Sequence, residues 1–175
     1  LTFDSLKDLS ISPKGTVLVC SPWNFPCAIP TGCIAAALLT GNPVLFKPAP
    51  EAVWCGYEIA KLFWEAGVPK EVLQFIPCDE ADGKALIEDP LLDVVMLTGH
   101  TETAKRFLSW RPELDLIAET GGKNTVFISA LCDRDQAIAH ILHSAFSFSG
   151  QKCSAASLLL CEAEVYDDPE FMTCL

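Results

Sequence analysis

Short apolar runs alternate with longer amphipathic or alanine-rich runs along most of this 175-residue chain. The apolar runs are rich in Val, Leu and Ile, as in GTVLVC at 15–20 and LDVVMLTG at 92–99. Each has the length of a strand, and the runs between them have the length of helices. Strands without polar alternation are typical of a parallel sheet that is covered on both faces. The sequence therefore predicts an α/β fold with helices on both faces of a parallel sheet.

The pattern changes after Gly122, and we expect a first domain over residues 1–122 and the start of a second over 123–175. The strands expected in the first domain are 15–20, 42–48, 71–77, 92–99 and 114–120, and its helices are 29–41, 51–67, 81–89 and 101–110. The second part is expected to contain a strand at 124–129, a helix at 133–150 capped by Asp133, a strand at 157–165 and the beginning of a further helix. We expect the chain to be a piece of a longer protein.

The charge balance excludes some classes of partner. The chain has 12 Lys and Arg against 23 Asp and Glu, a formal net charge of -11. Nucleic acids and anionic membrane surfaces are bound mainly through Lys and Arg, so neither is expected as a partner. No apolar stretch reaches the roughly 18 residues of a membrane span, and no cleavable leader is recognised.

The nine cysteines show no CxxC pair and no zinc-like spacing with histidine. Several lie in apolar runs, where a free thiol behaves as a small hydrophobic group. We therefore expect reduced thiols, a cytoplasmic protein and no metal site. His140 and His143 share one predicted helix and are interpreted as ordinary helix residues.

Polar residues follow several of the predicted strands, at the edge of a parallel sheet where ligands bind. SPWNFP (21–26) follows the first strand, Lys47 ends the second, TGHTE (98–102) ends the fourth and Glu119 ends the fifth. The GxGxxG fingerprint of dinucleotide-binding proteins is absent. These features alone predict a ligand of nucleotide size at this edge.

Five motifs occur in one order: SPWNFP, FKPA, LTGHTE, AETGGKN and SGQKCSA. Together they resemble the aldehyde dehydrogenase superfamily, from about residue 14 to the end of the chain. AETGGKN with SAFSFSGQKCSA is most similar to the branch that oxidises glutamate γ-semialdehyde, the hydrolysed form of 1-pyrroline-5-carboxylate, in proline catabolism. That branch includes the dehydrogenase half of bifunctional proline-utilisation proteins. The resemblance implies a Rossmann-like NAD-binding domain followed by the opening of an α/β catalytic domain.

The resemblance also implies three catalytic residues. Cys153 would attack the aldehyde carbon, and the resulting thiohemiacetal would be oxidised to a thioester that water hydrolyses. Lys152 places a positive charge beside this thiol, and the neighbouring residues are small. Asn24 and the backbone N–H of Cys153 would stabilise the oxyanion. Glu119, expected to be partly buried after Leu-Ile-Ala, would be the general base that activates water.

Other positions are implied to bind NAD or the substrate. Lys47 would bond the adenosine ribose hydroxyls, Trp23 would lie near the nicotinamide-side phosphate, and Thr98 and Gly99 would lie near the pyrophosphate. Gly121 would allow close approach of the backbone to the ligand. Ser154 and Lys152 are candidates for binding a substrate carboxylate, with solvated or capping roles as the alternative.

Three departures from the family pattern affect the cofactor positions. Pro50 occupies the place of a common ribose-binding glutamate, with Glu51 one position late, and His100 stands where a serine often follows Thr-Gly. The glycine-rich turn after the third strand is replaced by Cys78-Asp79-Glu80. Carboxylates near a pyrophosphate are unfavourable, and they disfavour the additional phosphate of NADP.

Two other functions stay open at this point. The chain could be a catalytically silent binding or scaffold module derived from the same family, or part of a dehydrogenase for a different semialdehyde. For the enzyme, we expect this chain alone to be inactive and its longer parent to be a homo-oligomer that acts on a small-molecule aldehyde.

Overall fold

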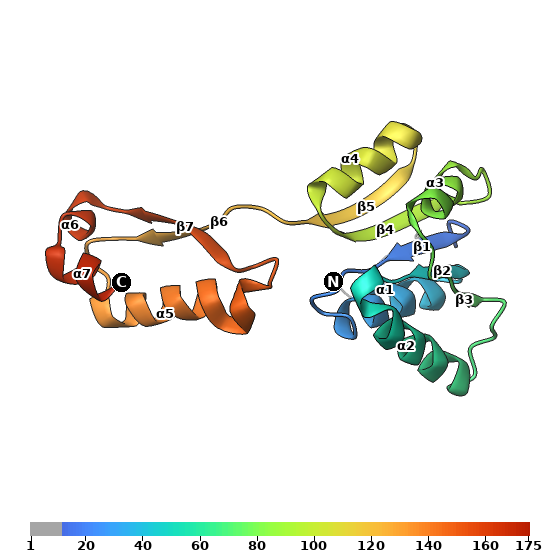
Figure 1. The fold of residues 1–175 in the computed structure, drawn as a ribbon, viewed down its shortest axis with the longest axis horizontal. Coiled ribbons are helices and arrows are strands. Elements are labelled where there is room, and N and C mark those ends of the chain that lie inside the picture. The colour runs from blue at the N-terminus through green and yellow to red at the C-terminus, as the bar shows by residue number, and fades with distance from the viewer. Residues whose placement is uncertain (1–11) are drawn as a thin grey trace, which may run out of the picture. The chain divides into compact units, whose positions relative to one another are not determined.

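The computed structural model describes residues 12–175 (Figure 1). The chain divides between Thr120 and Gly121 into two compact units, called unit 1 and unit 2 here, and each is described by itself. Unit 1 contains β1 (Val17–Cys20), α1 (Ala28–Leu39), β2 (Val44–Lys47), η2 (Pro50–Ala52), α2 (Val53–Glu65), β3 (Leu73–Phe75), α3 (Glu80–Glu88), β4 (Val94–Gly99), α4 (Thr101–Trp110) and β5 (Asp115–Thr120).

The strands of unit 1 form one parallel sheet in the order β3-β2-β1-β4-β5. Each strand is joined to the next strand in the chain through a helix, as parallel strands require. The order reverses at β1, because the chain moves from β1 toward β3 on one side and from β4 to β5 on the other. Cys20, the last residue of β1, is in register with Lys47 on β2 and Leu97 on β4. The predicted α/β fold with a parallel sheet is confirmed.

Both faces of this sheet are covered, because successive residues of β1 enter different cores. Val17 and Val19 pack in the core under α1 and α2, and Leu18 and Cys20 pack in the core under α3 and α4. Figure 1 shows the two helix pairs on opposite sides of the strands. Burial on both faces explains why the strands read as continuous apolar runs.

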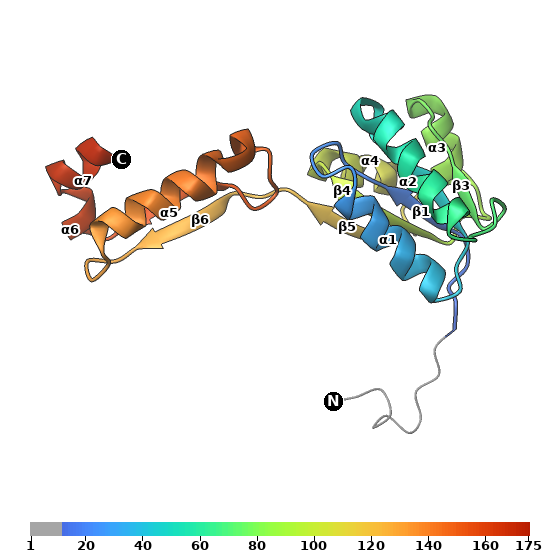
Figure 2. The same ribbon diagram turned by 90° about the horizontal axis from the view of Figure 1, so that it is seen from below.

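Unit 2 contains β6 (Asn124–Ile128), α5 (Arg134–Phe146), η3 (Ser147–Gly150), β7 (Ala156–Cys161), α6 (Ala163–Tyr166) and α7 (Pro169–Cys174). β6 and β7 pair in parallel, and Figure 2 shows α5 lying along β6. Ile128, Ile141, Val165 and Phe171 are the buried centre of the core of this unit. The predicted cap of α5 is confirmed, since the Asp133 carboxylate accepts a hydrogen bond from the Gln136 N–H at 3.0 Å.

Two predicted boundaries in unit 2 are wrong. The last strand ends at Cys161 instead of continuing to 165, because α6 begins at Ala163 and brings Val165 into the core, where it is fully buried. The long helix ends at Phe146 instead of Gly150, because Phe148 and Ser149 have φ of 55° and cannot continue an α-helix.

Within residues 12–175, no helix has the length and apolar character needed to cross a lipid bilayer.

Candidate functional site

Two loops of unit 1 meet at the point where the strand order reverses, beyond the carboxyl ends of β1 and β4. The first loop carries Trp23, which is exposed, and Asn24, which is half-buried. The Oδ1 atom of Asn24 accepts a hydrogen bond from the Phe25 N–H at 3.2 Å, so the oxygen of this amide faces the backbone. Thr98 and Gly99 end β4, and the reversal point is where α/β sheets bind ligands.

Lys47 extends from the end of β2 toward the first turn of α3. Its Cε atom lies 3.6 Å from the position that a Cβ atom of Gly83 would take, so the side chain passes against this glycine. The Ser21 N–H donates to the Lys47 carbonyl at 3.2 Å, which joins the loop after β1 to the end of β2. Lys47 and the loop that carries Asn24 therefore lie at the same edge of the sheet.

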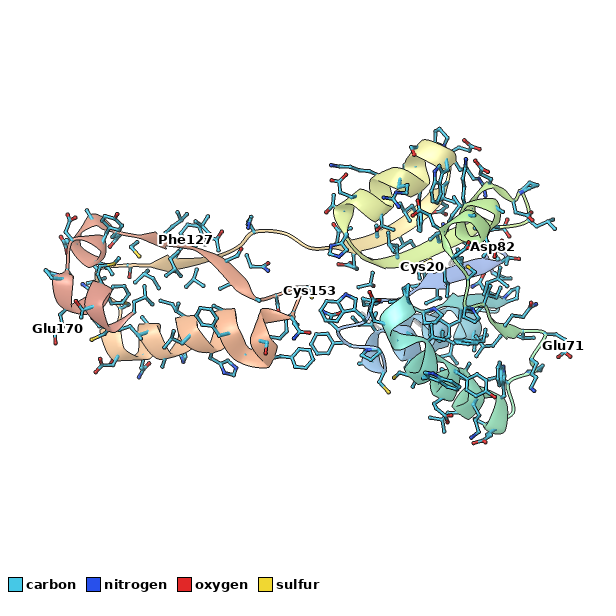
Figure 3. All side chains as sticks on the ribbon, in the orientation of Figure 1. Cys20, Glu71, Asp82, Phe127, Cys153 and Glu170 are labelled. Atoms are coloured by element: carbon cyan, nitrogen blue, oxygen red, sulfur yellow. The ribbon has the colours of Figure 1, made fainter. Side chains whose placement is uncertain are left out.

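Two thiols near Lys47 are kept neutral chiefly by burial. Burial raises the pKa of Cys20 to about 12, although the positive charge of Lys47 acts in the opposite direction. Burial also raises the pKa of Cys78; Lys47 lowers it, while Asp82 and Asp79 raise it further. Figure 3 labels Cys20 and Asp82 in this part of unit 1. The neighbourhood of Lys47 thus contains two neutral thiols and two carboxylates.

The carboxylates of the turn before α3 have partners within the protein. The Asp79 side chain caps the helix by accepting a hydrogen bond from the Asp82 N–H at 3.0 Å. Glu80 forms an ion pair with Arg106 of α4 at 2.8 Å. Part of the negative charge that the sequence places in this turn is therefore offset locally. The positive charge of Lys47 and the local partners of these carboxylates are compatible with a phosphate-bearing ligand at the Lys47 edge.

Glu119 differs from its expected environment. It lies on β5 opposite Thr98 of β4, near the carboxyl end of the sheet, but it is exposed and not partly buried. The reason is that β5 is the edge strand, where Ile117 is also exposed, so the Leu-Ile-Ala run before Glu119 does not signal a covered strand.

The remaining site candidates belong to unit 2. Gly121 opens unit 2. Cys153 is exposed in the loop between α5 and β7, where Figure 3 labels it, and Ser154 next to it is also exposed. The Lys152 Nζ donates to the Ser147 Oγ, which ties the two ends of the turn before Cys153 together.

The structure identifies one contact of Cys153 that the sequence did not reveal. Asn124, at the start of β6, donates from its side-chain nitrogen to the Cys153 carbonyl at 2.6 Å and to the Ala155 carbonyl at 3.0 Å. AETGGKN contains this asparagine, but nothing in its spacing indicates which backbone groups it meets. The contact depends on the pairing of β6 with β7.

All nine cysteines are free thiols, and they differ in exposure. Cys27, Cys153 and Cys174 are exposed, whereas Cys20 is buried. In the part of the chain that the structure describes, no three His, Cys, Asp or Glu side chains gather into a group that could hold a metal ion.

The strand order β3-β2-β1-β4-β5, with polar loops at the carboxyl edge, defines unit 1 as a Rossmann-like α/β domain of the nucleotide-binding type. The Aldehyde dehydrogenase family profile matches residues 4–173, and the chain belongs to this family. The resemblance carried by the five sequence motifs is thereby confirmed.

Three known proteins illustrate the similarity. The chain is 38% identical over 165 residues to 1-pyrroline-5-carboxylate dehydrogenase of Oceanobacillus iheyensis, covering 89% of this chain and 32% of that protein. It matches the structure of proline utilization A (PutA) from Corynebacterium freiburgense with a TM-score of 0.88 and 39% identity, over 98% of this chain and 18% of that one. The structure of 1-pyrroline-5-carboxylate dehydrogenase from Thermus with bound NAD matches with a TM-score of 0.83 and 36% identity, over 89% of this chain and 32% of that one. The chain thus spans about a third of the length of the curated relative.

Proposed function

We propose that the chain is the cofactor-binding and nucleophile-carrying part of an NAD-dependent aldehyde dehydrogenase. In this proposal, residues 1–122 are the NAD-binding domain and residues 123–175 begin the catalytic domain. The observation that carries it is the exposed Cys153 thiol in its motif, in a chain of this family whose parallel sheet presents Asn24 and Lys47 at one edge.

Five residues would hold the cofactor. Lys47 would bond the adenosine ribose, Trp23, Thr98 and Gly99 would contact the phosphates, and Gly121 would allow close approach of the backbone. NAD, when bound, supplies the acceptor for the two electrons and hydrogen removed from the substrate carbon. The carboxylates of Asp79 and Asp82 near Lys47 favour NAD over NADP, because they repel an additional phosphate.

The chemistry on the protein begins at Cys153. Its sulfur forms a bond to the aldehyde carbon while the carbonyl electron pair moves to oxygen, giving a thiohemiacetal. The side-chain NH₂ of Asn24 and the backbone N–H of Cys153 donate to this oxyanion. After oxidation to the thioester, Glu119 takes a proton from water, the hydroxide attacks the thioester carbon, and the sulfur leaves as the carboxylate product is released.

The substrate that we propose is glutamate γ-semialdehyde, oxidised to glutamate in proline catabolism. Support comes from the 38% identity to a protein named 1-pyrroline-5-carboxylate dehydrogenase. The ammonium group of Lys152 and the hydroxyl of exposed Ser154 would bind the substrate carboxylate. We further propose that the full-length protein is cytoplasmic and forms a homo-oligomer.

Replacing the nucleophile tests the reaction. In the full-length natural protein, NADH formation from NAD and glutamate γ-semialdehyde should fall at least about 10³-fold in Cys153→Ala, because no covalent intermediate can form. Cys174→Ala, which removes another exposed thiol, is the matched control and should retain activity. An unchanged rate in Cys153→Ala would contradict the proposal, and faster turnover of another semialdehyde would reassign the substrate.

Cofactor binding is tested separately by titrating NAD and NADP into the 175-residue chain by calorimetry, with circular dichroism to confirm folding. We expect binding of NAD that is tighter than that of NADP. A folded chain that binds neither would favour a catalytically silent module, with Pro50 and His100 as the responsible departures from the family pattern.

A further inference from the structure

Cys153 occupies the second position of a tight turn. The Ala155 N–H donates to the Lys152 carbonyl at 3.1 Å, so Cys153 and Ser154 are the two central residues. The Gln151 N–H donates to the Phe148 carbonyl at 3.1 Å in the turn just before it. The thiol is therefore carried by a segment with defined backbone hydrogen bonds instead of an open loop.

The backbone before this turn is in an uncommon conformation. Phe148 and Ser149 have φ of 55°, and Gly150 has φ of 70°. Left-handed residues other than glycine are strained, and they persist only where the surrounding structure holds them. The hydrogen bond from Lys152 to Ser147 joins the residues on either side of this left-handed run. The turn that carries Cys153 follows this run and has a contact of its own with another part of unit 2.

That contact comes from Asn124 at the start of β6. An asparagine amide has two N–H donors, and those of Asn124 reach the carbonyls of Cys153 and Ala155 on either side of Ser154. The regular pairing of β6 with β7 begins at Asn124 and Ala156, and a bulge follows, because Thr125 pairs with Leu158. Before Ala156, the backbone carbonyls of Cys153 and Ala155 are bonded by the Asn124 side chain and not by the backbone of a neighbouring strand. Bulges in general are over-represented next to active sites, where they re-aim side chains.

We propose that Asn124 is a positioning residue for the Cys153 nucleophile. By fixing the Cys153 carbonyl, it fixes rotation about the Cα–C bond of the nucleophile and the peptide plane that follows. The thiol and the backbone N–H of Cys153 then keep one orientation relative to β6. This inference rests on the proposed role of Cys153, and it adds a residue that does not contact the aldehyde itself.

A purely structural role for Asn124 makes a different prediction. The two hydrogen bonds stabilise the folded chain in either case. A positioning role requires in addition that the chemical step slows while cofactor binding is unaffected, since small displacements of a nucleophile cost up to about 10²-fold in rate.

The kinetic test uses the full-length natural protein with Asn124→Ala and with Asn124→Asp, which keeps the shape of the side chain but has no N–H donor. We expect kcat to fall about 10-fold to 10²-fold with the KM for NAD unchanged. Asn124→Gln, which keeps both donors, should recover part of the loss. The matched control is Thr125→Ala, which removes a local hydrogen bond from Thr125 to the Lys123 carbonyl. The inference is overturned if kcat stays at the level of the natural protein, or if Thr125→Ala loses as much.

A second measurement needs neither aldehyde nor NAD. In the 175-residue chain, the rate of alkylation of Cys153 by iodoacetamide is compared with that of Cys174 in the same molecule by peptide mass spectrometry. We expect the Cys153 to Cys174 ratio to fall at least about threefold in both Asn124→Ala and Asn124→Asp and to be unchanged in Thr125→Ala. An unchanged ratio in a folded Asn124 variant overturns the inference even where the proposed reaction is observed. A lowered ratio supports it even if the full-length protein forms no NADH, which would count against the proposed function alone.

Discussion

The ring of Pro48 lies against the backbone of Gly56, so that a Cβ atom on Gly56 would be 2.9 Å from the Pro48 Cβ and 3.3 Å from the Phe46 Cζ. Both neighbours are buried, and neither is the free end of a flexible side chain. This contact lets α2 approach the turn that follows Lys47.

Gly56→Ala is therefore expected to destabilise the chain. Alanine gains about 1 kcal/mol of helix propensity over glycine, but overpacking against Pro48 and Phe46 costs about 1–3 kcal/mol. Gly32→Ala is the matched control, because Gly32 lies in α1 and a Cβ there meets nothing within 4 Å. Urea unfolding should give a lower midpoint for Gly56→Ala and an equal or higher one for Gly32→Ala. An equal rise in the urea midpoint for both variants would show that α2 can shift away from Pro48.

Gly15 combines a left-handed backbone with close contact. Its φ is +125°, and a Cβ there would be 1.9 Å from the Asp93 Oδ2, which accepts a hydrogen bond from the Thr16 N–H at 2.7 Å. We expect Gly15→Ala to lower stability by about 2–4 kcal/mol, because strain adds to the displacement of this carboxylate. Gly67 has a comparable φ of +102°, and a Cβ atom there would meet nothing within 4 Å. Gly67→Ala should therefore show the cost of backbone strain alone. Thermal unfolding that ranks Gly67→Ala as the more destabilised variant would contradict this account.

Burial of Cys20 links stability to alkaline pH. The thiol of the unfolded chain ionises near its ordinary pKa of 9.0, whereas the folded thiol has its pKa raised to about 12. Between these values the unfolded state has lost the proton that the folded state keeps, so stability falls as pH rises through this window, by about 1.4 kcal/mol per pH unit.

The measurement is the free energy of unfolding from pH 8 to pH 11, compared with that of Cys20→Ala. The variant should be less stable at neutral pH but should decline less steeply in alkali, since the other titrating groups are shared. Cys174→Ala, at an exposed thiol, should follow the natural chain. Parallel curves for the natural chain and Cys20→Ala would be inconsistent with a buried neutral thiol.

Lys47 should contribute to NAD binding through its charge. Lys47→Met keeps most of the length of the side chain, and we expect it to weaken NAD binding about tenfold, equivalent to about 1.4 kcal/mol. Lys84→Met is the control, because Lys84 lies on α3 next to Gly83 but pairs with Glu88 at 3.5 Å. If calorimetry gives the same dissociation constant for NAD with the natural chain and with Lys47→Met, Lys47 does not contribute to NAD binding.

Much of unit 1 could be predicted because its central strands are buried on both faces. Val17 to Cys20 read as one apolar run, and in the structure alternate residues of that run enter opposite cores. Polar residues after such runs identified the carboxyl edge of the sheet before any strand order was known. Asp133 was predictable for a local reason, since its side chain bonds the N–H three residues later.

The errors concern features that depend on distant parts of the chain. Glu119 follows an apolar run like those of the central strands, but the position of β5 at the sheet edge leaves it exposed. Val165 continues an apolar strand pattern, yet it joins Phe171 in a core that requires a helix there. The contact of Asn124 with Cys153 joins residues 29 positions apart, and no local pattern encodes it.

The parallel pairing of β6 with β7 also determines when the surroundings of Cys153 form. The chain must pass through α5 before β7 can return beside β6, so the bonds from Asn124 are among the late, non-local contacts of this unit. Until then Cys153 has only the surroundings that its sequence neighbours provide, as the other eight thiols do. The environment that distinguishes it is thus a product of complete folding, and an incompletely folded chain, during synthesis or after stress, lacks the oriented thiol that the proposed reaction requires.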